Sequence, residues 1–135
     1  MRREVFDYFR IAGLTAQSKN DGINPKRHFM LGSVGVRNDG AIVKSSNGPT
    51  QVPSRHVHAE KKLCQKLDYG ATVYVARVKY SDGSFGCSRP CPNCFRALAA
   101  KKVKKVFYTI DNRSYGVINI EKMEEKIVLY KPLEI

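Results

Sequence analysis

Hydrophobic and polar residues alternate along the chain in patterns that predict a succession of helices and strands. Residues 2–18 carry apolar side chains at nearly helical spacing, at Val5, Phe6, Phe9, Ala12 and Ala16. Residues 29–36 and 41–44 are typical of strands. The Asn38-Asp39-Gly40 turn between them predicts a β-hairpin, because Asn and Gly accept the positive φ of tight turns.

The second half of the chain predicts a strand, a helix and a strand in succession. Apolar residues four apart predict a short helix at 58–67, and the alternation at 72–79 predicts a strand. A further helix from Pro92 and a strand at 103–110 follow a glycine-containing loop at 81–86. A crossover of this kind joins two parallel strands and is right-handed. Residues 115–120 predict one more strand, whereas residues 121–135 receive no assignment.

These elements predict an α/β fold, with a mixed sheet of about five strands and helices on both faces. The 135 residues, 42% of them hydrophobic, suffice for one domain spanning 1–135 with a real core. No apolar run approaches the ~20 residues of a membrane span, so we expect a cytoplasmic protein without a membrane partner. In a reducing compartment, three cysteines within eight residues suggest metal ligands or catalytic thiols.

The chain is strongly basic, with 24 Lys and Arg against 12 Asp and Glu and a formal net charge of +12. Residues 58–110, which also contain all four cysteines, hold eleven basic and three acidic side chains, a net +8. Such a balance favours anionic partners, of which nucleic acids and nucleotides are the commonest. The alternative is a set of hydrated lysine-rich faces that only confer solubility.

Two short motifs stand at the starts of the predicted helices at 58–67 and 92 onward. They are His58-x-Glu60 and Pro90-Cys91-x-x-Cys94. Cysteines three apart in a first helical turn point the same way, and the helix N-terminus favours their thiolate form. One imidazole and two thiolates give the three protein ligands of a catalytic zinc. Glu60 is then placed to shuttle a proton while the zinc supplies hydroxide near neutral pH.

This pair of motifs is the signature of zinc nucleobase deaminases, and the chain resembles the cytidine and deoxycytidylate deaminase superfamily. The resemblance follows the element order over most of residues 1–120. It implies a three-layer α-β-α sandwich, Zn²⁺ bound by His58, Cys91 and Cys94, and hydroxide attack on C4 with Glu60 as the proton shuttle. It further implies that Asn47 holds the base or its sugar and that the Ala59 amide contacts the base. Relatives commonly form oligomers, so a homo-oligomer is compatible with the resemblance.

Other residues carry weaker indications. His56 is interpreted as a substrate-pocket residue, Arg89 as a contact for a phosphate near the metal, and Tyr115 as an aromatic platform for a base. Phe85 and Tyr108 are further aromatic candidates, although Tyr108 fits ordinary core packing better. Cys87 is interpreted as a small packed side chain. Lys101–Lys105 is interpreted as a solvated helix end that suits the helix dipole.

The sequence therefore predicts a zinc-dependent hydrolytic deaminase that converts cytosine to uracil. A net charge of +12 exceeds what one phosphate requires, which favours cytosine in DNA, single-stranded by preference, as substrate. A dCMP or cytidine deaminase of nucleotide salvage is the first alternative. The second is a non-catalytic nucleic-acid-binding zinc module, in which Cys87, Cys91, Cys94 and either His56 or His58 close the coordination shell.

Overall fold

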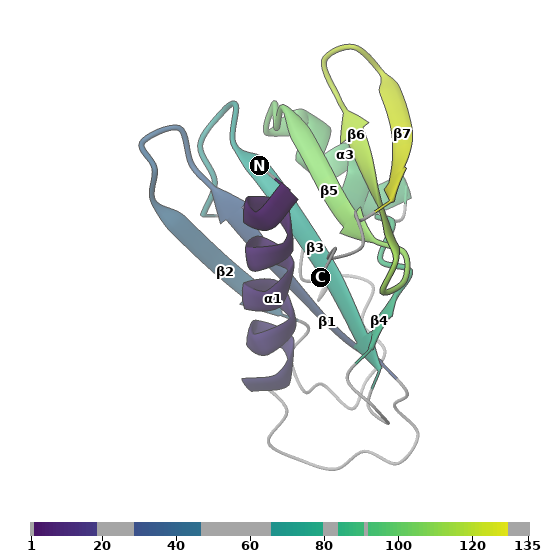
Figure 1. Ribbon diagram of the computed structural model, residues 1–135. Helices are drawn as coiled ribbons and strands as arrows, with labels where there is room; N and C mark the ends of the chain where they lie inside the picture. The colour runs from purple at the N-terminus through teal and green to yellow at the C-terminus, as the bar shows by residue number, and fades with distance from the viewer. Residues whose placement is uncertain (1, 19–28, 47–65, 80–83, 91, 130–135) are drawn as a thin grey trace.

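The computed structural model describes residues 2–18, 29–46, 66–79, 84–90 and 92–129 (Figure 1). Within these ranges the elements are α1 (Arg2–Ser18), β1 (Phe29–Val36), β2 (Ile42–Ser46), β3 (Thr72–Lys79), β4 (Phe85–Gly86), α3 (Pro92–Ala100), β5 (Lys105–Thr109), β6 (Ser114–Asn119) and β7 (Glu124–Leu129). The helix predicted at 58–67 falls almost entirely outside the described residues. The remaining predicted helices and strands all have a counterpart in the structure.

The strands form one mixed sheet in the order β2-β1-β3-β5-β6-β7, and β4 pairs with the end of β3. The predicted hairpin is confirmed by the antiparallel pairing of β1 with β2. The predicted crossover is confirmed as well, because β3 and β5 are parallel from Thr72↔Lys105 to Val75↔Tyr108. All other pairings are antiparallel.

The described sheet has seven strands, so the prediction of about five was too low. One of the two additional strands, β4, arises within the predicted loop at 81–86, where Phe85 and Gly86 pair with Val78 and Arg77. The other, β7, forms in the unassigned tail and pairs along the whole of β6. Each of these strands pairs with the strand that precedes it along the chain, and neither has an apolar alternation of its own.

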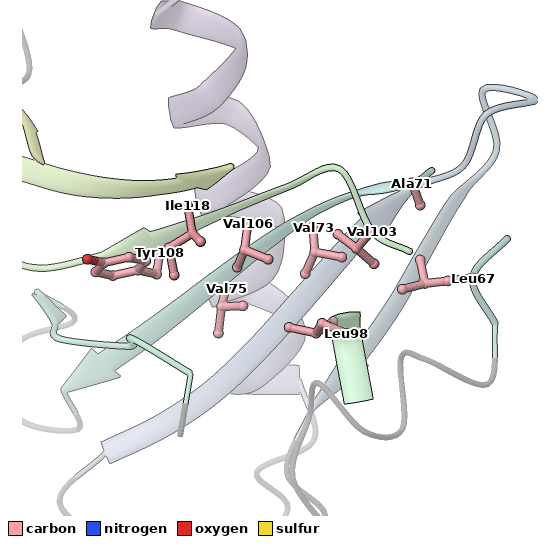
Figure 2. Packing of buried hydrophobic residues seen from close by; sticks show 9 residues of the cluster. All are labelled: Leu67, Ala71, Val73, Val75, Leu98, Val103, Val106, Tyr108 and Ile118. Carbon is pink, nitrogen blue, oxygen red and sulfur yellow. The ribbon is translucent and has the colours of Figure 1, made fainter. Parts of the chain in front are cut away.

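Helices cover both faces of the sheet in the described part of the chain. Alternate residues of β3 belong to different clusters, since Val73 and Val75 pack with Leu98 of α3 whereas Tyr74 packs with Phe9 of α1. Figure 2 shows Leu98 beside the valines of its cluster. Successive side chains of a strand point to opposite faces, so α1 and α3 lie on opposite sides. The mixed sheet and its two helices form an α/β architecture.

Helix α1 approaches the sheet closely at Gly13, where an added Cβ would come 3.1 Å from a methyl carbon of Val78. The glycine weakens the helix intrinsically, by about 1 kcal/mol relative to Ala. Because glycine has no side chain, the helix backbone can lie near β3, and the helix residues Phe9 and Ala12 are fully buried. None of the helices in the described ranges is long and apolar enough to cross a membrane.

Candidate metal centre and active site

Cys94 is the predicted zinc ligand that the structure describes, and it lies in the first turn of α3. The helix begins at Pro92, where the missing N–H costs no hydrogen bond and the fixed φ suits a helix start. Cys94 is the third residue of this helix, and its side chain is fully buried. The cysteine therefore faces the protein interior at the end of the helix where thiolate charge is favoured.

The segment that leads into the cysteine motif is fastened to the sheet by Ser88. Its backbone N–H donates to the carbonyl of Thr109 at 2.8 Å, and its hydroxyl donates to the carbonyl of Val75 at 2.8 Å. In return, the N–H of Thr109 donates to Ser88 Oγ at 2.8 Å. Ser88 is 4% exposed, so these bonds form away from water and their loss would leave buried polar groups unsatisfied. Ser88 therefore ties the segment to both β3 and β5.

Thr109, the last residue of β5, extends this fastening. Its hydroxyl donates to the carbonyl of Gly86 at 2.7 Å and accepts the N–H of Arg77 at 3.2 Å. Because β3 and β5 are parallel, the contacts fix the segment 86–90 near their carboxyl ends. Ligands of open α/β sheets bind outside this end of the strands. The sheet thus presents the cysteine motif at the edge where a substrate site is expected.

Arg89, predicted to contact a substrate phosphate, is engaged by a carboxylate from the far end of the chain. Its Nε and one terminal nitrogen each lie 3.0 Å from a different oxygen of Glu125 on β7. This two-point geometry is the strong form of an ion pair between guanidinium and carboxylate. The side chains are 54% and 32% exposed, so water still screens the pair. In this arrangement the charge of Arg89 is balanced within the protein.

Tyr108 completes this cluster by donating a hydrogen bond from its hydroxyl to Glu125. The hydrogen bond with Arg89, supported by that with Tyr108, lowers the pKa of Glu125 below its ordinary 4.5. Burial, followed by the hydrogen bond with Glu125, raises the pKa of Tyr108 to about 12. The hydrogen bond with Glu125 also raises the pKa of Arg89. At neutral pH the cluster is a cation, an anion and a neutral phenol.

The ring of Tyr108 passes directly over Gly116 of β6. A Cβ at position 116 would lie only 2.0 Å from a ring carbon of Tyr108. Tyr108 is 2% exposed, as its interpretation as a core residue predicted, and its hydroxyl reaches the edge of the core (Figure 2). Gly116 therefore makes room for the ring that holds Glu125 toward Arg89.

A cleft of about 370 Å³ borders this cluster between the start of α3 and β7. Pro90 and Pro92, on either side of Cys91 in the sequence, belong to its lining, together with Arg89, Arg96 and Glu125. Cys94 is not among the lining residues. The cleft thus adjoins the cysteine motif without including the described ligand.

Tyr115 does not have the surroundings expected of an exposed platform. It is 5% exposed and packs edge-on against Phe9 at 5.8 Å between ring centroids. Polar neighbours in the sequence suggested exposure, but β6 turns this side chain toward α1. Phe85 is half-buried and contacts Phe6 and Phe9. Cys87, interpreted as a packed side chain, is instead exposed.

The other predicted site residues lie outside the described residues. They are Asn47, His56, His58, Ala59, Glu60 and Cys91. Within the described ranges no three His, Cys, Asp or Glu side chains come together as a metal site. The chemistry of the donor set, a buried thiol at a helix start with a second cysteine and a histidine in the motifs, nevertheless fits zinc.

Glu125 and its two partners could not have been found from the sequence. Glu125 lies 36 residues from Arg89, in a tail without a helix or strand pattern. The available signal was the pair Glu124-Glu125 in a basic chain, which does not indicate a partner. Only the pairing of β7 with β6, which sets Glu125 opposite Ile118, brings the carboxylate within reach.

The mixed sheet, the buried cysteine at the start of α3 and the two motifs are compatible with a zinc-binding deaminase. A family model described as the cytidine and deoxycytidylate deaminase zinc-binding region matches residues 6–110. The match covers most of the chain, which therefore belongs to this family, and Zn²⁺ is its cofactor. No curated protein matches the chain at a significant level.

Proposed function

We propose that this protein is a hydrolytic deaminase that converts cytosine to uracil, and that it prefers cytosine in single-stranded DNA. The observation that carries the reaction class is the fastening of residues 86–90, which lead into the Pro90-Cys91-x-x-Cys94 motif, at the carboxyl end of parallel strands in a member of a zinc-binding deaminase family. The three-layer sandwich and the predicted helix at 58–67 belong to this proposal.

The proposed roles follow the motifs residue by residue. His58, Cys91 and Cys94 hold the zinc, which supplies the Lewis acidity that makes water nucleophilic near neutral pH. The carboxylate of Glu60 takes one proton from water and delivers it to the ring nitrogen of the base. It then takes the second proton, from the hydroxyl newly bonded to C4, and delivers it to the amine as the C4–N bond breaks. Cytosine and water are consumed, and uracil and ammonia are released. Asn47, His56 and the amide of Ala59 orient the base.

The net charge of +12 supports a polynucleotide substrate. A single strand presents several phosphates in a row, and each cation that neutralises one of them contributes to binding. Because Arg89 is paired with Glu125, this support comes from charges elsewhere on the molecule.

A free cytosine nucleotide or nucleoside is the second candidate. The burial of Tyr115 favours it, because it removes the predicted aromatic platform for a base of a strand. A non-catalytic zinc module is a poorer explanation, because it gives no role to Glu60 in the His58-x-Glu60 motif.

The deciding experiment incubates the zinc-loaded protein with dCMP, cytidine and a cytosine-containing oligonucleotide, and measures uracil formation in each. We expect uracil in the oligonucleotide, with a rate that falls steeply as salt rises. Turnover of dCMP with none of the oligonucleotide would refute the preference for DNA. Absence of uracil from all three substrates would refute the assignment as a cytosine deaminase.

Glu60→Gln tests the proton shuttle within the same assay. The amide keeps the size of the side chain but cannot accept and return the proton, so we expect turnover to fall by about 10²-fold or more. Zinc content, measured by metal analysis, should remain one ion per chain. Loss of zinc from this variant would assign Glu60 to the metal shell instead.

A further inference from the structure

Tyr69 is an exposed aromatic residue in the turn before β3. It lies near the C-terminal end of α3, whereas Cys94 lies in the first turn of that helix. Its side chain is 63% exposed, and the ammonium groups of Lys101 and Lys102 lie 5.9 and 5.8 Å from its ring centroid. An exposed aromatic residue alone needs no explanation. An aromatic ring grouped with several cations is a different matter, because nucleic-acid surfaces combine these two features.

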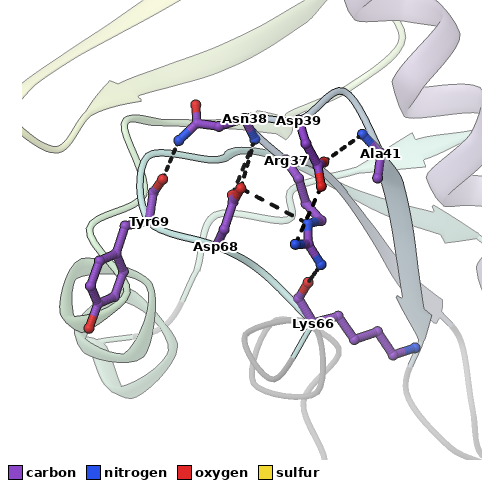
Figure 3. Close-up of polar contacts among 7 residues, drawn as sticks. All are labelled: Arg37, Asn38, Asp39, Ala41, Lys66, Asp68 and Tyr69. Atoms are coloured by element: carbon purple, nitrogen blue, oxygen red, sulfur yellow. Dashed lines mark hydrogen bonds and ion pairs between the residues drawn. The ribbon is translucent and has the colours of Figure 1, made fainter.

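The backbone that carries Tyr69 is fixed by two neighbouring loops. The N–H of Asn38 donates to the carboxylate of Asp68 at 3.1 and 3.2 Å, and the side-chain amide of Asn38 donates to the carbonyl of Tyr69 (Figure 3). Gly70 donates its N–H to the carbonyl of Lys102 at 2.9 Å. Figure 3 shows the Tyr69 ring pointing away from the Asn38 contacts. The backbone on either side of Tyr69 is thus held in place, and its ring is exposed.

A cleft of about 520 Å³ lies beside this ring. Tyr69, Lys102 and Lys104 contribute to its lining, and Ile120 adds an apolar wall. The lining contains one acidic residue, Glu121. Lys102 and Lys104 are exposed, and Lys101 is half-buried at the foot of the same turn. The cleft therefore combines an apolar floor, an aromatic face and three nearby cations.

We propose that Tyr69, Lys101, Lys102 and Lys104 form a binding surface for a single nucleic-acid strand, distinct from the zinc centre. A base stacks on the exposed ring of Tyr69, and the lysines neutralise the adjoining phosphates. Helix α3 spans only about 14 Å at ~1.5 Å per residue, so one strand can contact both of its ends. The inference rests on the proposed DNA substrate for its biological role, but binding can be tested without catalysis.

The test uses fluorescence anisotropy with labelled oligothymidylate of about 15 nucleotides, near the largest site size of single-strand-binding folds. It contains no cytosine, so binding is measured apart from deamination. We expect Tyr69→Leu to weaken binding about five-fold or more, whereas Tyr69→Phe keeps the ring and retains binding. Lys101→Gln/Lys102→Gln should lower the slope of log K against log salt by about 1.4, the value for two phosphates of a single strand.

The matched control is Lys79→Gln/Lys126→Gln, which removes two charges at exposed positions outside the surface. Binding lost equally in this control and in the lysine pair of the surface would overturn the proposal, since only net charge would matter. Binding unchanged in Tyr69→Leu would overturn it as well. Thermal unfolding of each variant separates loss of binding from loss of folding.

Two further arms identify the occupant and separate this proposal from that of the DNA substrate. If dTMP or inorganic phosphate displaces the labelled oligothymidylate as effectively as the unlabelled oligonucleotide does, the occupant is a small anion and the proposal of a nucleic-acid strand is overturned. Surface-dependent binding of oligothymidylate, with no uracil formed in a cytosine-containing oligonucleotide, supports the surface and refutes the DNA substrate. If uracil forms in the cytosine-containing oligonucleotide but Tyr69→Leu binds oligothymidylate as tightly as the unmodified protein, the DNA substrate is supported and the proposed binding surface is refuted.

Discussion

Arg89 illustrates how a single residue can change its meaning once its partner is known. Two residues before Cys91, an arginine is well placed to meet a phosphate. In the structure Nε and one terminal nitrogen of its guanidinium both donate to Glu125, at 3.0 Å each. The sequence determined that a cation stands here, and the fold determined that the cation is already paired. Whether a charge is available to a ligand is a property of its surroundings.

Glu125→Gln should weaken the folded state in a pH-dependent way. The pKa of Glu125 is lowered below 4.5, so its contribution to stability is complete above about pH 4.5 and disappears as pH falls through the lowered pKa. At pH 7 we expect the variant to lose about 0.5–1 kcal/mol in the free energy of unfolding, since the pair is partly exposed. The difference from the unmodified protein should shrink below pH 4.5. Urea denaturation across this pH range measures it.

Glu124→Gln is the matched control for this change. Glu124 is the neighbouring carboxylate on β7. Arg89 and Tyr108 donate their hydrogen bonds to Glu125 and not to Glu124. The control should stay within about 0.5 kcal/mol of the unmodified protein. Equal losses in the two variants, or a loss that does not change with pH, would contradict the importance of the Arg89 pair.

At the scale of elements, the turn at 68–71 joins three parts of the chain that are distant in sequence. It accepts hydrogen bonds from Asn38. Gly70 donates its N–H to the carbonyl of Lys102, and the carbonyl of Ala71 accepts the N–H of Lys104. Gly70 has φ +85°, which side chains rarely adopt, and lies next to the amide of Asn38. The turn therefore links the β1–β2 hairpin to the exit from α3.

Gly70→Ala and Gly40→Ala together separate backbone strain from crowding. The two glycines have φ values of +85° and +86°, so an Ala at either site costs about 1–2 kcal/mol from the backbone alone. At position 70 the added Cβ would also lie 2.7 Å from Asn38 Nδ2, whereas nothing lies within 4 Å at position 40. We expect Gly70→Ala to cost about 1 kcal/mol more than Gly40→Ala in urea denaturation. Equal losses would show that Asn38 moves aside freely.

Elements with their own internal pattern were predictable, and elements defined by a partner were not. Helix α1 and strands β1 and β3 follow from apolar spacing, and α3 follows from Pro92 and the residues after it. Strand β4 has two residues, too few for any pattern. Strand β7 is exposed along almost its whole length and begins Glu-Glu-Lys, so its sequence lacks the alternation of a half-buried strand. Pairing with β6 alone makes it a strand.

At the scale of the whole molecule, zinc should stabilise the fold as well as supply chemistry. A metal that binds only the folded chain at a thousand times its Kd contributes about 4 kcal/mol. Removal of zinc with a chelator should therefore lower the melting temperature by roughly 15 °C and abolish deamination, and added zinc should restore both. A melting temperature that does not change when metal analysis shows the zinc to be gone would contradict this expectation.

Cysteine variants distinguish an open catalytic site from a closed structural one. Cys94→Ala removes a buried thiol of the predicted ligand set and should lose zinc. Cys87→Ala, an exposed thiol outside that set, should keep zinc and the unmodified melting temperature. Loss of zinc from both variants would instead support the closed shell that includes Cys87.

The sequence by itself indicated the family and most of the local elements of this protein. The His58-x-Glu60 and Pro90-Cys91-x-x-Cys94 motifs resemble the signature of zinc nucleobase deaminases, and the family match agrees. The tertiary structure decided which charges are available, for it pairs Arg89 with Glu125, buries Tyr115 and gathers lysines around the exposed Tyr69. The reason is physical. Motifs act over a few residues of covalent chain, whereas burial and ion pairing depend on strands and loops that only folding brings together.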